Sequence, residues 1–381
     1  MAILITSEDK LKDLVIELSN LDSIALDTES NSFYVYREEL CLLQVSTKDA
    51  DYIIDTLAIK DLNPLNDLFS RKRPEKVFHS AEADIRVIKG AGAFQFINIF
   101  DIMTAARMAG WKDYGLAPLL LKYFGIKLDK KHQLSNWGKR PLSEEQLDYA
   151  SKDTQYLLQL KDKLLPELKN KDMLEEAMEE FAQIAEIEPS KREFNPEGFR
   201  SIRGAKDLSQ RSLTVLRELY LYREEEARTR NKPTFKILPD FMLVRIAQKP
   251  VKSFDSLKAV HQMTPYQLKY YSNGVLRAIA HAEKAEPAPL LLPKNNNGKS
   301  PNIRRSKLAT EIYDNLRAWR NDIAETRKMD ASTIISNKAL KCIAYAAPKN
   351  METLANVPEL NKWKCARYGE SMLKIIRSSI K

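Results

Sequence analysis

Short apolar runs and amphipathic segments alternate along the first part of the chain. The apolar runs lie at 21–26, 40–45, 51–55, 76–79 and 97–100, with polar or turn-forming residues between them, which is the pattern of strands. Leucines three positions apart between 62 and 69, and a second segment at 83–89, predict helices between the later strands. Three successive strands, followed by alternating helices and strands, predict a mixed five-stranded sheet with helices on its faces.

From Asp101 onward the apolar spacing is helical. Ser143 stands three residues before Gln146, which is the spacing of a capping box at the start of a helix. The helix that begins there is predicted to continue through 158, with an inner face made of Leu147, Ala150, Thr154, Leu157 and Leu158.

The last part of the chain contains an internal repeat. Arg223 matches Arg320, an offset of 320 − 223 = 97 residues, and the same offset holds without a gap for many apolar and aromatic residues. Examples are Leu219 with Leu316, Tyr222 with Trp319, Ile246 with Ile343 and Tyr271 with Tyr368. Two copies are too few for a solenoid, so the repeat predicts two small all-α domains.

These patterns divide the chain into five predicted parts. They are an α/β domain at 1–170, a helical connector at 171–207, helical domains at 208–286 and 304–381, and a linker at 287–303. The linker is assigned from its Pro, Asn, Gly and Ser content.

Composition narrows the class of protein. The 381 residues are 44% hydrophobic, enough for folded cores, and they contain no run of ~20 apolar residues that would cross a membrane. The first ten residues lack the pattern of a secretory signal, so we expect a cytoplasmic protein. Three dispersed cysteines and four histidines give little basis for disulfides or a histidine-bound zinc site. Metal chemistry would therefore depend on carboxylates.

The positive charge is concentrated in the second part of the chain. Residues 1–170 carry 23 basic and 26 acidic side chains, a balance of 23 − 26 = −3, whereas the remainder carries 38 and 26, or +12. An uneven basic excess of this kind predicts contact with a polyanion such as RNA, although it also serves solubility.

Five residues are candidates for the chemistry. Asp27 and Glu29 lie two positions apart on a predicted strand and so point to the same side, which is costly for like charges unless a cation lies between them. Asp84 opens a predicted helix, where an acid is also favoured by the helix dipole alone. Tyr149 and Asp153, four positions apart, share one face of the predicted helix, where a simple Tyr–Asp hydrogen bond is the structural alternative.

Together these residues form an ordered set that resembles the DEDDy exonucleases, which have a ribonuclease H-like fold. Within them the chain is most similar to the ribonuclease D family. Further segments carry the resemblance, namely Leu40–Gln44, Phe100–Ala106, Asp129–Gln133 and Trp137–Ser143. The repeated unit resembles the HRDC domain, a helical nucleic-acid-binding module that also occurs in RecQ helicases.

The resemblance implies a 3′→5′ exoribonuclease that releases nucleoside 5′-monophosphates by two-metal-ion hydrolysis. Asp27, Glu29, Asp84 and Asp153 would bind two divalent ions, Mg²⁺ or Mn²⁺, with Asp27 bridging them, and Tyr149 would position the attacking water. Asp84 would hold the second ion, in part through water. The implied substrate is RNA with a free 3′ end, such as a tRNA precursor. We expect a monomer with no obligate protein partner and no membrane association.

Two positions depart from the family pattern. Asn136 stands where an Asp is common before the tryptophan, and Ser80 stands where Asn is frequent before the third acid. Both departures affect expected substrate contacts rather than the four acids.

Two other functions remain open at this point. One is a Werner-type 3′→5′ DNA exonuclease, which shares the acidic set. The other is a non-catalytic RNA-binding scaffold, although retention of four mutually repelling acids argues against it.

If the repeated unit contacts RNA, we expect the contacts to come from its basic residues. These are Arg223, Arg228 and Arg230 in the first copy, and Arg320, Arg327 and Lys328 in the second; solvated helix faces are the alternative. Tyr220, Tyr222 and Trp319 lie at helical spacing and are predicted to be core residues.

Overall fold

The computed structural model describes residues 2–129, 131–189, 193–249, 251–260, 262–289, 307–327 and 329–380. Their contacts form two compact units. Unit 1 consists of Met1–Glu29, Leu40–Ser190 and Ser300–Lys381, and unit 2 consists of Ser30–Glu39 and Lys191–Lys299. The predicted linker lies outside the described residues from 290 onward, as does Lys328.

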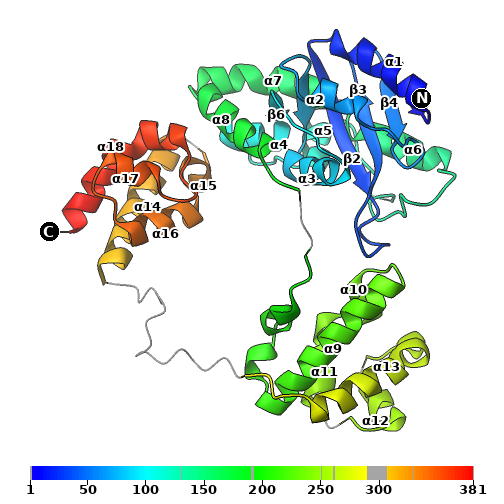
Figure 1. The fold of residues 1–381 in the computed structure, drawn as a ribbon. Coiled ribbons are helices and arrows are strands. Elements are labelled where there is room, and N and C mark those ends of the chain that lie inside the picture. The colour runs from blue at the N-terminus through cyan, green and yellow to red at the C-terminus, as the bar shows by residue number, and fades with distance from the viewer. Residues whose placement is uncertain are drawn as a thin grey trace. The chain divides into compact units, whose positions relative to one another are not determined.

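Unit 1 contains a mixed sheet. In the described part of the chain its strands are β1 (Ile3–Ile5), β2 (Ser23–Ser30), β3 (Leu40–Ser46), β4 (Asp51–Asp55), β5 (Glu75–Phe78) and β6 (Ile99–Asp101), in the order β1-β4-β3-β2-β5-β6 (Figure 1). The pairs β1–β4, β2–β5 and β5–β6 are parallel, whereas β3–β4 is antiparallel.

The mixed sheet is confirmed, but the predicted number of five strands is wrong. The additional strand, β1, is a three-residue edge strand that pairs with β4. Ile3 and Leu4 are 50% and 37% exposed, so this short segment lacks the buried apolar run by which the other strands were predicted.

Eight helices in the described residues surround this sheet. They are α1 (Glu8–Ser19), α2 (Pro64–Phe69), α3 (Ala81–Ala91), α4 (Ile102–Met108), α5 (Leu116–Phe124), α6 (Glu144–Lys152), α7 (Leu157–Asn170) and α8 (Leu174–Ala185). Successive residues of β4 point to opposite faces of the sheet. Tyr52 and Ile54 join the main core, whereas Ile53 packs in a smaller cluster with Trp137 and Ala150. None of the described helices is long and apolar enough to span a membrane.

The start of α6 follows the sequence prediction, but its end does not. The Ser143 side chain accepts a hydrogen bond from the Gln146 backbone, and the reciprocal bond completes the capping box. The predicted continuous helix is interrupted after Lys152, and α7 begins at Leu157. In the interruption the Thr154 hydroxyl lies 2.6 Å from that of Ser46 on β3, so tertiary hydrogen bonding replaces helical continuation.

Arg140 fixes the segment that leads into α6. Its Nε donates to Asp55 Oδ2 at 2.6 Å and its Nη2 to Asp55 Oδ1 at 2.7 Å, at the end of β4. Further bonds reach the carbonyl oxygens of Trp137 and Cys41. This bidentate ion pair attaches the loop after Trp137 to the sheet, and through it the first turn of α6.

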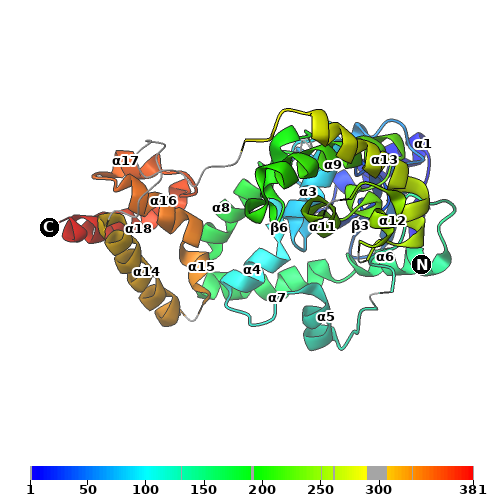
Figure 2. The ribbon, with the colours of Figure 1, turned by 90° about the horizontal axis from the view of Figure 1, so that it is seen from below.

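The repeated unit folds into two helical modules. The first comprises α9 (Gln210–Thr229), α10 (Thr234–Ile237), α11 (Asp240–Gln248), α12 (Phe254–Lys258) and α13 (Pro265–Lys284), in unit 2. The second comprises α14 (Lys307–Arg327), α15 (Ala331–Ile334), α16 (Asn337–Ala346), α17 (Met351–Ala355) and α18 (Lys362–Ser379), in unit 1 (Figure 2). Two short 3₁₀ helices, Pro196–Ser201 and Ala205–Asp207, precede the first module.

One buried arginine holds each module together. Arg223 Nη1 donates to the Leu238 carbonyl at 3.0 Å and to the Asp240 carboxylate at 2.6 Å. Arg320 makes the same pair of bonds 97 residues later, to the Ile335 carbonyl and the Asn337 side chain. Each arginine is only 5% exposed.

These contacts revise the prediction for the basic residues. Arg223 and Arg320 are internal structural residues, so the prediction that they contact RNA is wrong. Arg228 and Arg230 form surface ion pairs with Glu225 and Glu226. The prediction for the aromatic residues is confirmed, since Tyr220, Tyr222 and Trp319 pack against the module cores.

Arg327 and the last helix of the second module contact α8 within unit 1. Lys364 Nζ lies 2.5 Å from Glu180 Oε1, and Arg327 Nη1 lies 3.8 Å from the fully buried Glu176 carboxylate. Burial raises the pKa of Glu176 to about 7. Arg327 therefore contributes to packing within unit 1.

The segment Ser30–Glu39 belongs to unit 2, although it follows β2 in the chain. The Tyr36 hydroxyl donates to Glu224, and the Tyr36 backbone donates to Asn231 Oδ1 at 3.1 Å. Phe33 packs edge-to-face on Phe235, with ring centroids 6.3 Å apart. Contacts to α9, to α10 and to the residues between them therefore hold this segment.

We expect Arg140→Ala to destabilise unit 1 by about 2–4 kcal/mol, because the change leaves the Asp55 carboxylate, 6% exposed, without its partner. Urea unfolding followed by tryptophan fluorescence measures the difference. The matched control is Lys152→Ala, which removes an exposed ion pair with Asp148 and should cost no more than ~0.5 kcal/mol. Equal effects of the two substitutions would contradict the assignment.

Candidate active site

Two of the candidate acids lie on the central part of the sheet. Asp27 and Glu29 occupy the carboxyl end of β2, two positions apart, and their residues are half-buried. β2 runs parallel to β5, with Ala25 opposite Val77. The carboxyl ends of both strands therefore lie at the same edge of the sheet.

Asp84 reaches this edge from the helix that follows β5. It lies in the first turn of α3, as predicted, and is 7% exposed. The Thr28 hydroxyl, between the two acids of β2, donates to Asp84 Oδ1 at 2.6 Å. Thr28 thus ties the third acid to the strand that carries the first two.

The start of α3 is held by a carboxylate that sequence reasoning did not select. Asp101, 1% exposed, ends β6 and accepts from the Ala81 backbone at 2.7 Å and from the Thr104 backbone at 2.6 Å. It therefore caps α4 and fixes the first residue of α3, on which the position of Asp84 depends. An acid directly before a helical segment is a recognisable N-cap, but its second bond joins residues 20 positions apart.

Tyr149 and Asp153 come from α6 and its C-cap, on the sheet face that carries Trp137. The Tyr149 ring contacts those of His132 and Trp137, with centroid distances of 5.9 and 6.0 Å. Both neighbours belong to the segments by which the family resemblance was found, and their contact with Tyr149 was not predicted. Arg140 belongs to the same segment as Trp137. It ties this segment to Asp55 and so helps to hold the Trp137 ring beside Tyr149.

The pKa values show that the acids influence one another. Burial, followed by repulsion from Asp84, Asp153 and Glu29, holds the pKa of Asp27 well above its usual range. Burial and the charges of Asp153 and Asp84 raise the pKa of Glu29 to about 9. The pKa values of Asp84 and Asp153 are raised to about 7, in both cases chiefly by burial.

Tyr149 responds to the same acids. Burial, followed by the charges of Asp153, Glu29 and Asp27, raises the pKa of its phenol far above the usual value. The phenol is therefore protonated near neutral pH and can donate a hydrogen bond. All five candidate residues thus share one electrostatic environment.

The donor set fits hard divalent cations. Four carboxylates provide oxygen ligands, the type that Mg²⁺ and Mn²⁺ prefer, and no ion pair joins them to a basic residue in the described part of the chain. As the side chains stand, no three acidic, His or Cys groups among the described residues are close enough to hold an ion. A cation between the carboxylates would relieve their mutual repulsion.

Known families match both parts of the chain. A family model described as 3′-5′ exonuclease matches residues 2–169, and the HRDC domain model matches residues 212–279 and 309–376. The two HRDC matches are offset by the same 97 residues as the sequence repeat.

Individual relatives cover most of the chain. Ribonuclease D from Gluconacetobacter diazotrophicus is 31% identical over 98% of this chain and 92% of its own. The exosome complex component 10 homolog from Caenorhabditis elegans is 29% identical over 78% of this chain, which spans only 34% of that relative's length. A crystal structure of Escherichia coli RNase D has the same fold, with a TM-score of 0.70 and 24% identity over 99% of both chains.

We expect the metal-free protein to lose stability as pH rises. Because the folded-state pKa values of Glu29, Asp84 and Asp153 exceed their ordinary values, the folded protein binds more protons than the unfolded chain at intermediate pH. This contribution is present at low pH and is lost as pH rises through about 4 to about 9.

Thermal unfolding in chelator, from about pH 5 to about pH 8, tests this expectation. Asp153→Asn should gain stability relative to the parent protein as pH rises, and Mn²⁺ should stabilise the parent most at the higher pH. A constant difference between the two proteins would argue against the burial of these charges.

Proposed function

The chain belongs to the ribonuclease D family, and we propose that it is a divalent-metal-dependent 3′→5′ exoribonuclease. The observation that carries the proposal is the convergence of Asp27, Glu29, Asp84 and Asp153 in one electrostatic environment. The carboxylate set provides metal ligands, and Tyr149 provides a proton donor beside them.

Each acid has a distinct role in this proposal. Asp27, at the centre of the mutual repulsion, would bridge two ions, with Glu29 and Asp153 beside the ion that activates water. Asp84 has one oxygen engaged by Thr28, which suits a ligand that contacts the second ion with its other oxygen or through water. Bound divalent ions supply an activated water and stabilise the leaving 3′ oxygen of the phosphodiester.

Tyr149 would orient the attacking water by hydrogen bonding. Its hydroxyl makes no hydrogen bond to another described residue, and its raised pKa keeps it protonated. His132 and Trp137 limit the movement of the ring. Hydrolysis would release nucleoside 5′-monophosphates one at a time from the 3′ end.

The two HRDC modules support RNA as the substrate. Residues 208–286 contain 14 basic and 8 acidic side chains, or 14 − 8 = +6, and residues 304–381 contain 16 and 8, or +8. Such a surplus attracts a phosphate backbone and makes binding sensitive to salt. We propose tRNA precursors or other structured RNA as natural substrates, processed by a cytoplasmic monomer.

The alternative is a Werner-type DNA exonuclease, which the acidic set alone does not distinguish. The two HRDC modules and the 31% identity to a ribonuclease D favour RNA. A non-catalytic scaffold would have to retain four mutually repelling acids, one buried and three half-buried, without a use for them.

The decisive experiment compares 5′-labelled single-stranded RNA with DNA of the same sequence, in Mg²⁺, Mn²⁺ or chelator. We expect the RNA to shorten from its 3′ end only with metal. Asp27→Ala should lower the rate by more than about a thousandfold, because it removes the bridging ligand. Asp148→Ala, an exposed acid on the same helix as Tyr149, is the control and should leave the rate unchanged. Faster shortening of DNA would favour the alternative.

Tyr149→Phe should lower kcat by roughly 10²–10³-fold, because the ring is kept and only the hydrogen-bond donor is lost. Metal affinity, measured by calorimetry with Mn²⁺, should be unchanged. Tyr156→Phe, a tyrosine of the turn before α7 that packs on Phe124, is the matched control. An equal loss in both variants would rule out the specific role of the Tyr149 hydroxyl.

A further inference from the structure

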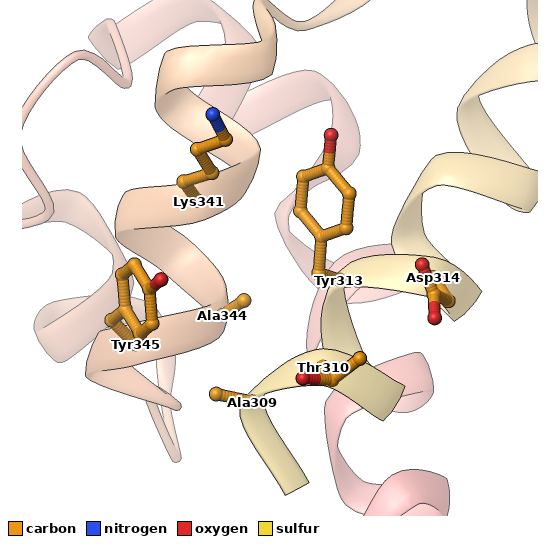
Figure 3. Close-up of a pocket in the computed structure, with 7 residues that line it drawn as sticks. All are labelled: Ala309, Thr310, Tyr313, Asp314, Lys341, Ala344 and Tyr345. Carbon is orange, nitrogen blue, oxygen red and sulfur yellow. The ribbon is translucent and has the colours of Figure 1, made fainter. Parts of the chain in front are cut away.

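The second HRDC module contains a cavity of about 260 Å³ between α14 and α16. Its floor is made of two small buried residues, Ala309 and Ala344. Figure 3 shows Tyr313 on α14 facing the helix that carries Lys341 and Tyr345. Two aromatic rings and a cation therefore surround a recess with a flat, small-residue floor.

Tyr345 and Lys341 face solvent at this cavity, whereas Tyr313 also packs against the core of the module. Tyr345 is 43% exposed, Lys341 is exposed and Tyr313 is half-buried. Among the described residues, none forms a hydrogen bond or ion pair with the hydroxyl of Tyr313 or Tyr345, or with the Lys341 ammonium. Packing of the module therefore does not explain the exposure of Tyr345 beside a lysine.

The first module shows that the fold does not require these residues. At the offset of 97, Tyr313, Lys341 and Tyr345 correspond to Leu216, Val244 and Gln248. Leu216 and Val244 are buried there.

One residue of the floor is common to both copies, since Ala344 corresponds to Ala247, whereas Ala309 corresponds to Ser212. In the first module Ser212, Ala247 and Gln248 line a cavity of about 340 Å³, with Lys249 and Lys252 beside them, but the equivalents of Tyr313 and Lys341 do not line it. The two cavities therefore share part of their lining, and the aromatic part of the lining occurs in the second copy.

We propose that Tyr313, Lys341 and Tyr345 bind one unpaired nucleotide of an RNA substrate. A base has a flat apolar face that stacks on tyrosine, and such stacking is the main device by which proteins hold single-stranded RNA. The cavity has room for one base rather than for a longer segment, and Lys341 provides a partner for the adjoining phosphate. The site lies in the module with the larger basic surplus.

The acid at the cavity sets the orientation of the nucleotide. Figure 3 shows Asp314 on the opposite side of Tyr313 from Lys341. Its negative charge repels a phosphate and accepts a hydrogen bond from a base N–H group, so the base edge lies toward Asp314 and Thr310. The phosphate then lies toward Lys341.

This inference rests on the proposed function for the identity of the ligand, because RNA is the proposed substrate. It adds a binding site that takes no part in hydrolysis. An RNA long enough to occupy both this cavity and the active site gains affinity, whereas a uridine trinucleotide, which cannot occupy both, gains none.

The test measures the dissociation constant of a 5′-fluorescein uridine oligomer by anisotropy, with the full-length protein in chelator so that no cleavage occurs. Tyr345→Ala should weaken binding roughly tenfold, the loss expected for one stacked base. Tyr345→Phe should restore it, because the ring is kept. Lys341→Ala should lower the slope of affinity against salt concentration by about one phosphate contact.

Gln248→Ala changes the equivalent position of the first module and should bind like the parent protein. Cleavage of the uridine trinucleotide with Mn²⁺ should be the same in Tyr345→Ala and the parent, which separates this site from the active site. Since Tyr345 is partly exposed, thermal unfolding should show that Tyr345→Ala remains folded.

The outcomes separate the two proposals. An unchanged dissociation constant for Tyr345→Ala, or an equal loss for Gln248→Ala, would overturn the nucleotide site even if the parent protein shortens RNA. Weaker binding by Tyr345→Ala in a protein that never shortens RNA would keep the nucleotide site and reject the exonuclease. Preference of the site for single-stranded DNA over RNA would overturn the assigned ligand.

Discussion

The placement of several carboxylates at one edge of the sheet is the constraint on which the catalytic domain depends. Burial and mutual repulsion make this arrangement unfavourable without a cation, so the rest of the domain has to hold the acids in place. The central strand positions Asp27 and Glu29, and the hydrogen bond from Thr28 positions Asp84. Asp101 ends β6, two strands away from β2 in the sheet, and it holds the first residue of the helix that carries Asp84. Hydrogen-bonded supports therefore offset the electrostatic cost of bringing these acids together.

Tyr149 is likewise held in place by neighbouring residues, on another part of the domain. Arg140 ties the Trp137 segment to Asp55, and this segment supplies one of the two rings beside Tyr149. The role proposed for Tyr149, to orient the attacking water, requires a narrow range of positions, because small displacements lower the rate of a positioned reaction. Ion pairing and ring packing at a distance from the reacting atoms provide that restriction.

Much of the site was predictable from the sequence, because residues close together in the chain carry it. The spacing of two places Asp27 and Glu29 on one side of a strand, and the spacing of four places Tyr149 and Asp153 on one face of a helix. The order of the acids along the chain indicated the family. The partners of these residues were not predictable in this way. Thr28 and Asp84 are 56 positions apart, and no local pattern links them. Arg223 and Arg320 were wrongly assigned to the surface, since charge normally implies exposure; only the fold shows the carbonyl oxygens that make their burial possible.

The membership of Ser30–Glu39 in unit 2 has a practical consequence for dissecting this protein. Ser30 is both the last residue of β2 and the first residue of that segment, directly after Glu29. A truncation near residue 190 would separate the sequence of the exonuclease domain from the HRDC modules. It would also remove the residues that contact Phe33 and Tyr36. The shortened protein would carry a loop of exposed aromatic residues directly after Glu29. Kinetic differences between fragment and whole would then report the loss of this packing as well as the loss of the HRDC modules.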